Sequence, residues 1–291
     1  MVAAGRAPEL TAAMAKKSSF EAFYDRMSEV YDPPMTRREY LEDDRYGNVV
    51  ARVASGPPHQ RILDAGCGNG WLASLYAAGH TVVGIDLADA NLARIRALGI
   101  LALKYNLDAP LPFADGTFDT VVCSEILEHI FSPDLLLREI LRVLKPGGRV
   151  ILTVPNLHCF RNRVELFFGR HTPFVEYRVS DDPTDELAHV GVQHIHHYTV
   201  AGMAGNLRTI GFERIEWRGQ SFHMNAALPF MVLSLLHGGN RGLRALLRVV
   251  SLGHIQREYP GLEVRLWVMK VLGRLFPRLS PGMLFVAYRP A

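Results

Sequence analysis

The chain has 291 residues, of which 48% are hydrophobic, and its formal net charge is +3. This composition is enough to build a packed core, while the small charge, with no run of five basic residues, disfavours a dedicated nucleic-acid binder. Three cysteines without CxxC spacing disfavour a disulfide framework or a cysteine zinc site. They suit a reducing compartment, so we expect a cytoplasmic protein.

No segment of the sequence is predicted to span a membrane. The N-terminal stretch MVAAGRAPELTAAMAKKSSF lacks the apolar centre of a signal peptide. The longest apolar stretch, residues 226–236, has 11 residues and contains a proline, whereas a spanning helix needs about 20. We therefore expect a soluble chain, with at most peripheral contact at the inner membrane surface.

Strands and helices alternate along most of the chain. Short β-branched runs predict buried parallel strands, and stretches with apolar residues at helical spacing predict helices between them. The predicted strands are 61–66, 81–86, 100–106, 118–125, 149–156, 213–219 and 283–290, and the predicted helices are 70–80, 87–99, 132–148 and 199–212. This alternation predicts an α/β fold with a doubly wound, mostly parallel seven-stranded sheet.

Helical inserts interrupt this core. We expect a helical lid segment in residues 1–55 and a cofactor-binding core in 56–219 and 283–291. Within the core, residues 156–197 lack clean periodicity and predict an insert on the substrate side. An apolar and basic helical insert is expected at 220–282.

The turn after the first strand indicates a nucleotide cofactor. Its glycines, Gly66, Gly68 and Gly70, follow G-x-G-x-G, and Trp71 stands where the dinucleotide fingerprint G-x-G-x-x-G has its last glycine. The spacing therefore disfavours an NAD(P)-dependent oxidoreductase. Asp86, at the end of the second strand, suits a ribose diol. Asp64 either attracts a cationic group or caps the turn.

Four ordered segments resemble the motifs of one family. LDAGCGNG, VVGIDLAD, NLDAPLPFADGTFDTVVCSEILEHI and LRVLKPGGRVILTVPN are similar to the successive motifs of class I S-adenosylmethionine-dependent methyltransferases, in particular ubiquinone-type small-molecule methyltransferases. The resemblance covers roughly residues 60–156. It implies a Rossmann-like fold, the cofactor S-adenosylmethionine and methyltransferase activity.

The resemblance also implies cofactor-binding residues. These are Asp64, Gly66, Gly68, Gly70, Asp86, Leu87, Asn106, Leu107, Ser124 and Glu125. Family members often have an Asp near the adenine amine, and here either Asn106 or Asp108 occupies that position. Asp119 is expected to anchor a turn rather than to touch the cofactor.

Histidines are the candidate bases for a hydroxyl acceptor, because their pKa lies near neutrality. We consider His158, which follows the fifth strand, and His194 and His129 as catalytic candidates; His129 is equally consistent with a structural role. His196 and His197 are candidate substrate residues. The segment 194–199 resembles the family's H-x-R-x-x-T, with His196 in place of arginine. A His-x-His-His run could hold zinc, but we expect polar packing with one catalytic histidine and no metal.

Two further segments bear on the acceptor. Tyr24, Tyr31 and Arg38 are candidate lid residues over the cofactor, or else belong to a solvated helix face. Residues 221–291 carry nine basic and two acidic residues, so this part has a net charge of +7 and the rest −4. Basic helices with bulky apolar residues can lie on an anionic membrane, or can pack on the core with solvated arginines.

Together these features predict O-methylation of a small or lipid-like metabolite. N- or C-methylation of a small molecule is an open alternative, because the core motifs do not distinguish acceptors. A catalytically silent S-adenosylmethionine-binding module is a second alternative.

Overall fold

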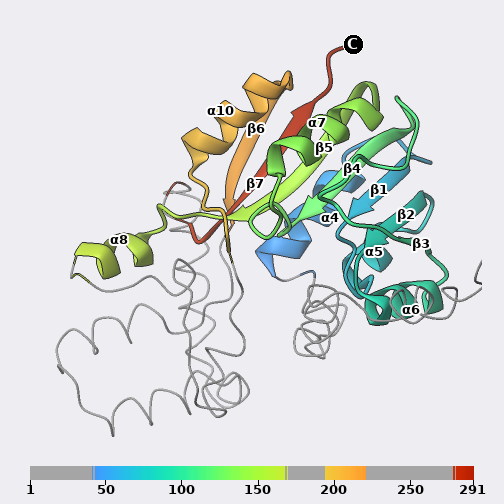
Figure 1. Ribbon diagram of the computed structural model, residues 1–291, viewed down its shortest axis with the longest axis horizontal. Coiled ribbons are helices and arrows are strands. Elements are labelled where there is room, and N and C mark those ends of the chain that lie inside the picture. Colours follow the sequence, from blue (N-terminus) through green and yellow to red (C-terminus); the bar gives the residue numbers. More distant parts are fainter. Residues whose placement is uncertain (1–40, 42, 168, 170–193, 221–277, 279) are drawn as a thin grey trace, which may run out of the picture.

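The sheet has seven strands, as the sequence predicts. The computed structural model describes residues 41, 43–167, 169, 194–220, 278 and 280–291 (Figure 1). The strand order is β3-β2-β1-β4-β5-β7-β6. The strands are β1 (Arg61–Ala65), β2 (Thr81–Asp86), β3 (Leu101–Lys104), β4 (Phe118–Ser124), β5 (Leu144–Pro155), β6 (Glu213–Gln220) and β7 (Gly282–Tyr288).

Strand directions place the carboxyl ends of β1 to β5 at one edge of the sheet. Each neighbouring pair among β3, β2, β1, β4 and β5 is parallel, and β7 runs antiparallel between β5 and β6. The order reverses between β1 and β4, because the chain winds outward from β1 in one direction and then from β4 in the other. Ligands of such sheets bind beyond the carboxyl ends of the strands at this switch point.

Helices cover both faces of the sheet (Figure 1). The described helices are α4 (Asp44–Ala54), α5 (Trp71–Tyr76), α6 (Asp89–Ala97), α7 (Pro133–Val143), α8 (Phe160–Phe167) and α10 (Val200–Ile210). One core cluster contains the buried side chains of α4, α5 and α6, and the other contains those of α7 and α10. The expected doubly wound architecture is confirmed.

The helix expected at 132–148 is shorter in the structure. α7 ends at Val143, and Leu144, in extended conformation, already pairs with Phe118 of β4. Pro146 explains this early end, because a residue before proline is disfavoured in helical conformation. Strand β5 therefore begins five residues before the expected position.

Helix α4 is tied to the amino edge of the sheet by a buried arginine. Arg149 of β5 donates from Nη2 to the carbonyl oxygen of Val53 at 3.2 Å and from Nη1 to Ser55 Oγ at 3.3 Å. Val49 and Val53 are fully buried. A guanidinium at the carboxyl end of a helix also interacts favourably with the helix dipole.

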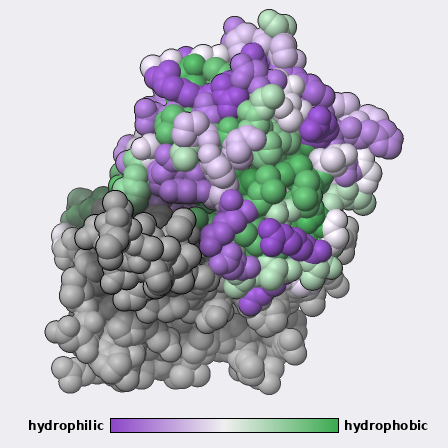
Figure 2. All heavy atoms as spheres, turned by 45° about the vertical axis from the view of Figure 1, so that its right-hand side comes forward, coloured by the Kyte–Doolittle hydropathy of each residue, from purple (hydrophilic) through white to green (hydrophobic). Residues whose placement is uncertain are grey.

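The visible surface of the described part is largely polar with an apolar patch (Figure 2). The edge strand β3 leaves Leu101 61% exposed. Among the helices that the structure describes, none combines the length and the apolar character that crossing a membrane requires.

Candidate cofactor and acceptor site

The glycine turn lies directly after β1. Gly66, Gly68 and Gly70 have φ angles of 76°, 52° and 82°, in the left-handed region that favours glycine. A Cβ on Gly66 would come within 2.1 Å of Ile126 Cδ1, and one on Gly70 within 2.6 Å of Ile95 Cγ1. A Cβ on Gly68 would meet nothing within 4 Å. Two glycines therefore permit close packing, while Gly68 borders open space that a ligand can enter.

Asp86 closes this turn from the end of β2. Its Oδ2 accepts a hydrogen bond from Gly68 N at 2.9 Å, and its Oδ1 accepts from Ala88 N at 2.9 Å and from Asn91 Nδ2 at 3.3 Å. Burial raises the pKa of Asp86, and these hydrogen bonds, with one from Leu87 N, oppose the rise. The carboxylate is thus held beside the open side of the glycine turn.

Asp64 has a different environment at the end of β1. It is 2% exposed, and its Oδ2 accepts a hydrogen bond from Tyr76 Oη at 2.6 Å. Burial raises the pKa of Asp64 to about 7, the Tyr76 hydrogen bond lowers it and the charge of Asp86 raises it. Tyr76 is not predictable as a site residue from the sequence, because a contact between α5 and β1 leaves no spacing signal.

Ser124 and Glu125 lie where β4 ends. Ser124 Oγ is 2.9 Å from Thr153 Oγ1, and Glu125 N donates to Thr153 O at 3.0 Å. Glu125 has a φ of 55°, and its Oε1 is buried without a hydrogen-bond partner among the described residues. Burial raises the pKa of Glu125, and the charge of Arg45 in α4 opposes the rise. Likewise, nothing in the sequence indicates that Arg45 lies near Glu125.

The two candidates for the adenine position have separate structural partners. Asn106 Oδ1 accepts from Asp108 N at 3.0 Å, whereas Asp108 Oδ1 accepts from Ser132 N at 2.9 Å at the start of α7. Asn106 is exposed, and Leu107 is buried in the core. Each side-chain oxygen thus accepts one backbone N–H group, and Asn106 is the more exposed of the two residues.

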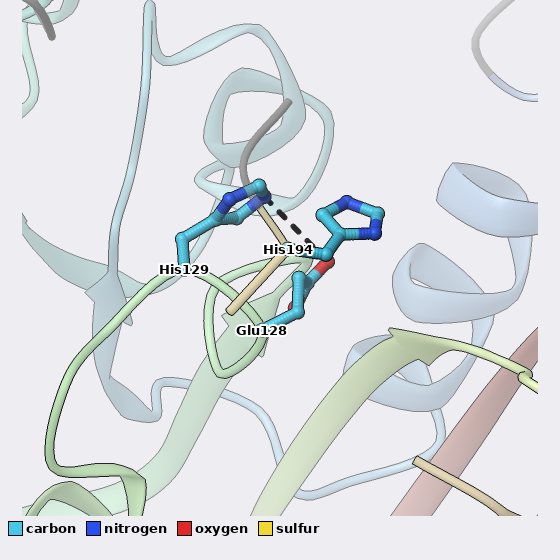
Figure 3. A group of neighbouring side chains, drawn as sticks. All are labelled: Glu128, His129 and His194. Atoms are coloured by element: carbon cyan, nitrogen blue, oxygen red, sulfur yellow. Dashed lines mark ion pairs between the residues drawn. The ribbon is translucent and has the colours of Figure 1, made fainter. Parts of the chain in front are cut away.

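Two of the candidate histidines come together at the end of β4. The rings of His129 and His194 lie edge to face with centroids 4.9 Å apart, and His129 Nε2 is 3.8 Å from Glu128 Oε1. Figure 3 shows the three side chains converging, two from the turn after β4 and one from the segment before α10. Burial, followed by the charges of His129 and His197, lowers the pKa of His194 to about 3. Its imidazole is therefore neutral at physiological pH.

The remaining histidines have other surroundings. His158 is exposed after β5, and its N donates to Asn156 Oδ1 at 3.0 Å. His196 is half-buried, with Nε2 buried and lacking a hydrogen-bond partner in the described part of the chain. His197 is exposed. Thr199, the last residue of the H-x-R-x-x-T-like segment, caps α10 by accepting from Gly202 N at 3.1 Å.

The lid candidates Tyr24, Tyr31 and Arg38 lie outside the described residues, as does most of the insert expected at 220–282. Asp119, which was expected to anchor a turn, instead joins the starts of neighbouring strands. It accepts from Arg61 N at 2.8 Å and from Lys145 Nζ at 2.6 Å.

Comparisons with known proteins agree with this arrangement. The model of a methyltransferase domain family matches residues 63–152. A demethylmenaquinone methyltransferase of Clavibacter sepedonicus is 31% identical over 175 residues, which are 57% of this chain and 71% of that protein. The chain belongs to the S-adenosylmethionine-dependent methyltransferases.

Other members of the family are matched over shorter parts. A ubiquinone biosynthesis O-methyltransferase of Xanthomonas campestris is 36% identical over 43% of this chain and 54% of its own. A probable S-adenosylmethionine-dependent methyltransferase of Mycolicibacterium smegmatis is 31% identical over 49% of this chain and 54% of its own. The chain thus spans about half the length of these two curated relatives.

Solved structures share the fold. A possible histamine N-methyltransferase from Thermotoga maritima has a TM-score of 0.55 at 14% identity, covering 92% of this chain and 99% of that one. A phosphoethanolamine N-methyltransferase of Haemonchus contortus, solved with S-adenosylmethionine, has a TM-score of 0.51 at 20% identity, covering 93% and 57%. The Rossmann-like methyltransferase fold is therefore confirmed, and the cofactor of this methyltransferase is S-adenosylmethionine.

Proposed function

We propose that this methyltransferase transfers a methyl group from S-adenosylmethionine to a hydroxyl group of a small or lipid-like metabolite. One observation carries the proposal. The open glycine turn with Asp86 and the cluster of Glu128, His129 and His194 lie beyond the carboxyl ends of adjacent parallel strands. A cofactor site and a group able to act on an acceptor therefore share one edge of the sheet.

The residues at this edge fit the cofactor. Asp86 would accept hydrogen bonds from the ribose hydroxyls, since a carboxylate oxygen that already accepts from Gly68 N has a second lone pair. The open side of Gly68 would receive the methionyl part. Asp64 would attract its cationic amine.

The rest of the cofactor would contact residues after β3 and β4. We assign the adenine to Asn106 and Leu107, and the surroundings of the reactive centre to Ser124 and Glu125, with Leu87 beside the ribose. The bound cofactor supplies an activated methyl group. The protein therefore has to align the acceptor oxygen and keep water away.

We assign activation of the acceptor to the histidine cluster. A hydroxyl becomes a better nucleophile as it loses its proton, and this transfer needs a basic or cationic group close to the oxygen. His129 and His194 are paired next to the buried Glu128, whereas His158 is exposed at the next strand end. His158, together with His196 and His197, is then assigned to the border of the acceptor site.

Apolar side chains beside the cluster favour an acceptor with an apolar part. Phe131 is 65% exposed and Ile195 is 40% exposed, and both lie within two residues of a member of the cluster. Exposed apolar residues around a polar centre are typical of sites for apolar ligands. Two relatives are named for quinone biosynthesis or a demethylmenaquinone, which also supports a lipid-like acceptor.

Methyl transfer into an extract tests the proposal. The protein is incubated with methyl-labelled cofactor and separate lipid and water-soluble extracts of the source organism, and the labelled product is analysed by mass spectrometry. A methyl ether on a small molecule supports the proposal. A labelled amine or carbon-bound methyl contradicts O-methylation, and cofactor binding without labelling of any fraction indicates a silent binding module.

The variant His194→Ala separates the acceptor role from cofactor binding. Loss of a group that activates the acceptor lowers turnover by roughly 10²–10⁴. We expect this loss with unchanged affinity for S-adenosylhomocysteine, measured by calorimetry. An equal loss of cofactor affinity would instead mean that His194 supports the fold of the site.

A further inference from the structure

We propose that Glu128, His129 and His194 form a binding site for one divalent transition-metal ion, of which zinc fits best. This inference gives the acceptor-activating role of the proposed function a chemical basis. The site itself depends only on these three side chains, so it can be tested without any methyl acceptor.

The three side chains place their ligand atoms close together. One ligand atom from each side chain lies within 4.8 Å of the other two, and His129 Nε2 is 3.8 Å from Glu128 Oε1 (Figure 3). Bonds from zinc to histidine nitrogen and carboxylate oxygen are about 2.0–2.1 Å long, so ligand atoms around a tetrahedral ion lie about 3.4 Å apart. The ligand atoms of His129 and Glu128 are farther apart than this value in the structure, so the side chains would rotate toward one another on binding the ion.

The carboxylate of Glu128 is buried in a way that favours a bound cation. Glu128 is 1% exposed, and neither Oε1 nor Oε2 has a hydrogen-bond partner among the described residues. A buried carboxylate without a hydrogen-bond partner is costly, and buried charges in proteins are paired or coordinate metals. A cation between Glu128 and the two imidazoles would remove this cost.

The backbone holds the site in place without the ion. Ile195 N and His196 N both donate to the carbonyl oxygen of Glu128, at 2.9 and 3.2 Å. Tyr198 Oη donates to the carbonyl oxygen of Leu127 at 3.2 Å. The segment that carries His194 is thus fixed beside the turn after β4, so ion binding requires little ordering of the chain.

The ligand types determine the class of metal. Imidazole nitrogen suits zinc, iron, nickel and copper, whereas magnesium and calcium prefer oxygen ligands. Two histidines and one carboxylate leave a coordination position open, as in catalytic zinc sites. An acceptor hydroxyl bound there would lose its proton more readily, because the cation stabilises the oxyanion.

Metal binding is measured on the full chain without a polyhistidine tag, after removal of bound metal with EDTA and dialysis. Zinc chloride is titrated by calorimetry, and cobalt chloride is followed by its visible absorption, which reports the coordination geometry. The variants are Glu128→Gln and His194→Ala. The control is His59→Asn, because His59 is exposed and has a φ of 55° that asparagine tolerates.

We expect one zinc ion per chain, bound with equal affinity by the wild type and His59→Asn. Either cluster variant should bind zinc at least about 100-fold more weakly, because even residues that only hydrogen-bond to metal ligands contribute about 10–100-fold to metal affinity. Equal zinc binding in all four proteins, or binding of magnesium but not of zinc, would overturn the site. If Glu128→Gln does not fold, His194→Ala decides. Titration of S-adenosylhomocysteine into the same samples tests the cofactor site separately, so each proposal can fail alone.

Discussion

Asp64 and Asp86 end neighbouring strands but differ in their surroundings. Asp86 accepts from the backbone N–H groups of Gly68, Leu87 and Ala88 and from the Asn91 amide, and is half-buried. Asp64 is almost fully buried and accepts from the Tyr76 hydroxyl. Because amide donors stabilise a carboxylate and burial destabilises it, the two groups respond differently to pH and to a ligand.

The variant Asp86→Ala should weaken binding of S-adenosylhomocysteine by about 1–3 kcal/mol, because charge-assisted hydrogen bonds to the ribose would be lost. Calorimetry measures the affinity. The matched control is Asp89→Ala, which removes an exposed carboxylate three residues along the chain that pairs with Lys104. Unchanged affinity in Asp86→Ala would remove Asp86 from the cofactor site.

Asp64 should make the free protein less stable as the pH rises. The pKa of its carboxyl is about 7 in the folded chain against an ordinary value of 3.8, so between these values the folded state binds more protons than the unfolded state. Stability then falls with pH in this window by up to about 1.4 kcal/mol per pH unit. Urea unfolding of the wild type and Asp64→Asn from pH 4 to 8 measures the effect. Parallel pH profiles of the two proteins would contradict it.

For single residues, the sequence predicted which side chains lie at strand ends, but it did not predict which side chains they contact. Asp64, Asp86, Ser124 and Glu125 each follow or end a strand, as expected. The pairing of His129 with His194 joins residues that are far apart in the chain, and no local pattern encodes such a contact. Glu128 lies within one of the family-like motifs but was given no role of its own, although it is the buried member of the cluster.

At the scale of elements, the glycine turn needs a left-handed backbone conformation and, at Gly68, free space for a ligand. Substitutions can separate these two requirements. Gly68 and Gly79 both have positive φ angles, 52° and 80°, and a Cβ on either would meet nothing within 4 Å. Gly79 lies between α5 and β2, at the other edge of the sheet. The two positions therefore have similar backbone strain but different distances from the proposed cofactor.

Alanine at either position should lower stability by about 1–2 kcal/mol through this strain. Only Gly68→Ala should also weaken binding of S-adenosylhomocysteine, because its methyl group would occupy the space proposed for the ligand. Thermal unfolding and calorimetry on both variants separate the two effects. Equal cofactor affinity in Gly68→Ala and Gly79→Ala would show that the cofactor does not approach Gly68.

Element identities were predictable from the sequence, and some boundaries were not. All seven strands were expected from β-branched runs, and all seven occur. The end of α7 was expected at the glycines after Pro146, but cross-strand pairing of Leu144 and the proline end the helix at Val143. Tertiary pairing therefore decided a boundary that propensity alone placed too late.

At the scale of the whole molecule, the contacts that join strand starts and the proposed functional site lie at opposite edges of the sheet. The amino edge contains the Arg149 and Asp119 contacts that join strand starts and α4. The carboxyl edge contains the glycine turn, Asp86 and the histidine cluster. Substitutions at the first edge should affect stability, and substitutions at the second should affect binding and turnover.

The basic segment 221–277 lies outside the described residues, and we propose that it widens the acceptor site and contacts anionic lipid. Its positive charge predicts binding to vesicles that contain phosphatidylglycerol at low salt, weakened by 0.5 M sodium chloride. Co-sedimentation measures this, with neutral phosphatidylcholine vesicles as the control. Absence of binding to anionic vesicles at low salt would rule out the membrane contact and leave packing on the core.

The central claim is that the turn after β1 and the end of β2 hold the S-adenosyl group. A crystal structure with S-adenosylhomocysteine at saturating concentration tests it most directly. We predict both ribose hydroxyls within hydrogen-bonding distance of the Asp86 carboxylate and the amino-acid portion along the Gly68 backbone. A nucleoside bound away from β2, or a crevice without ligand under these conditions, would contradict the account.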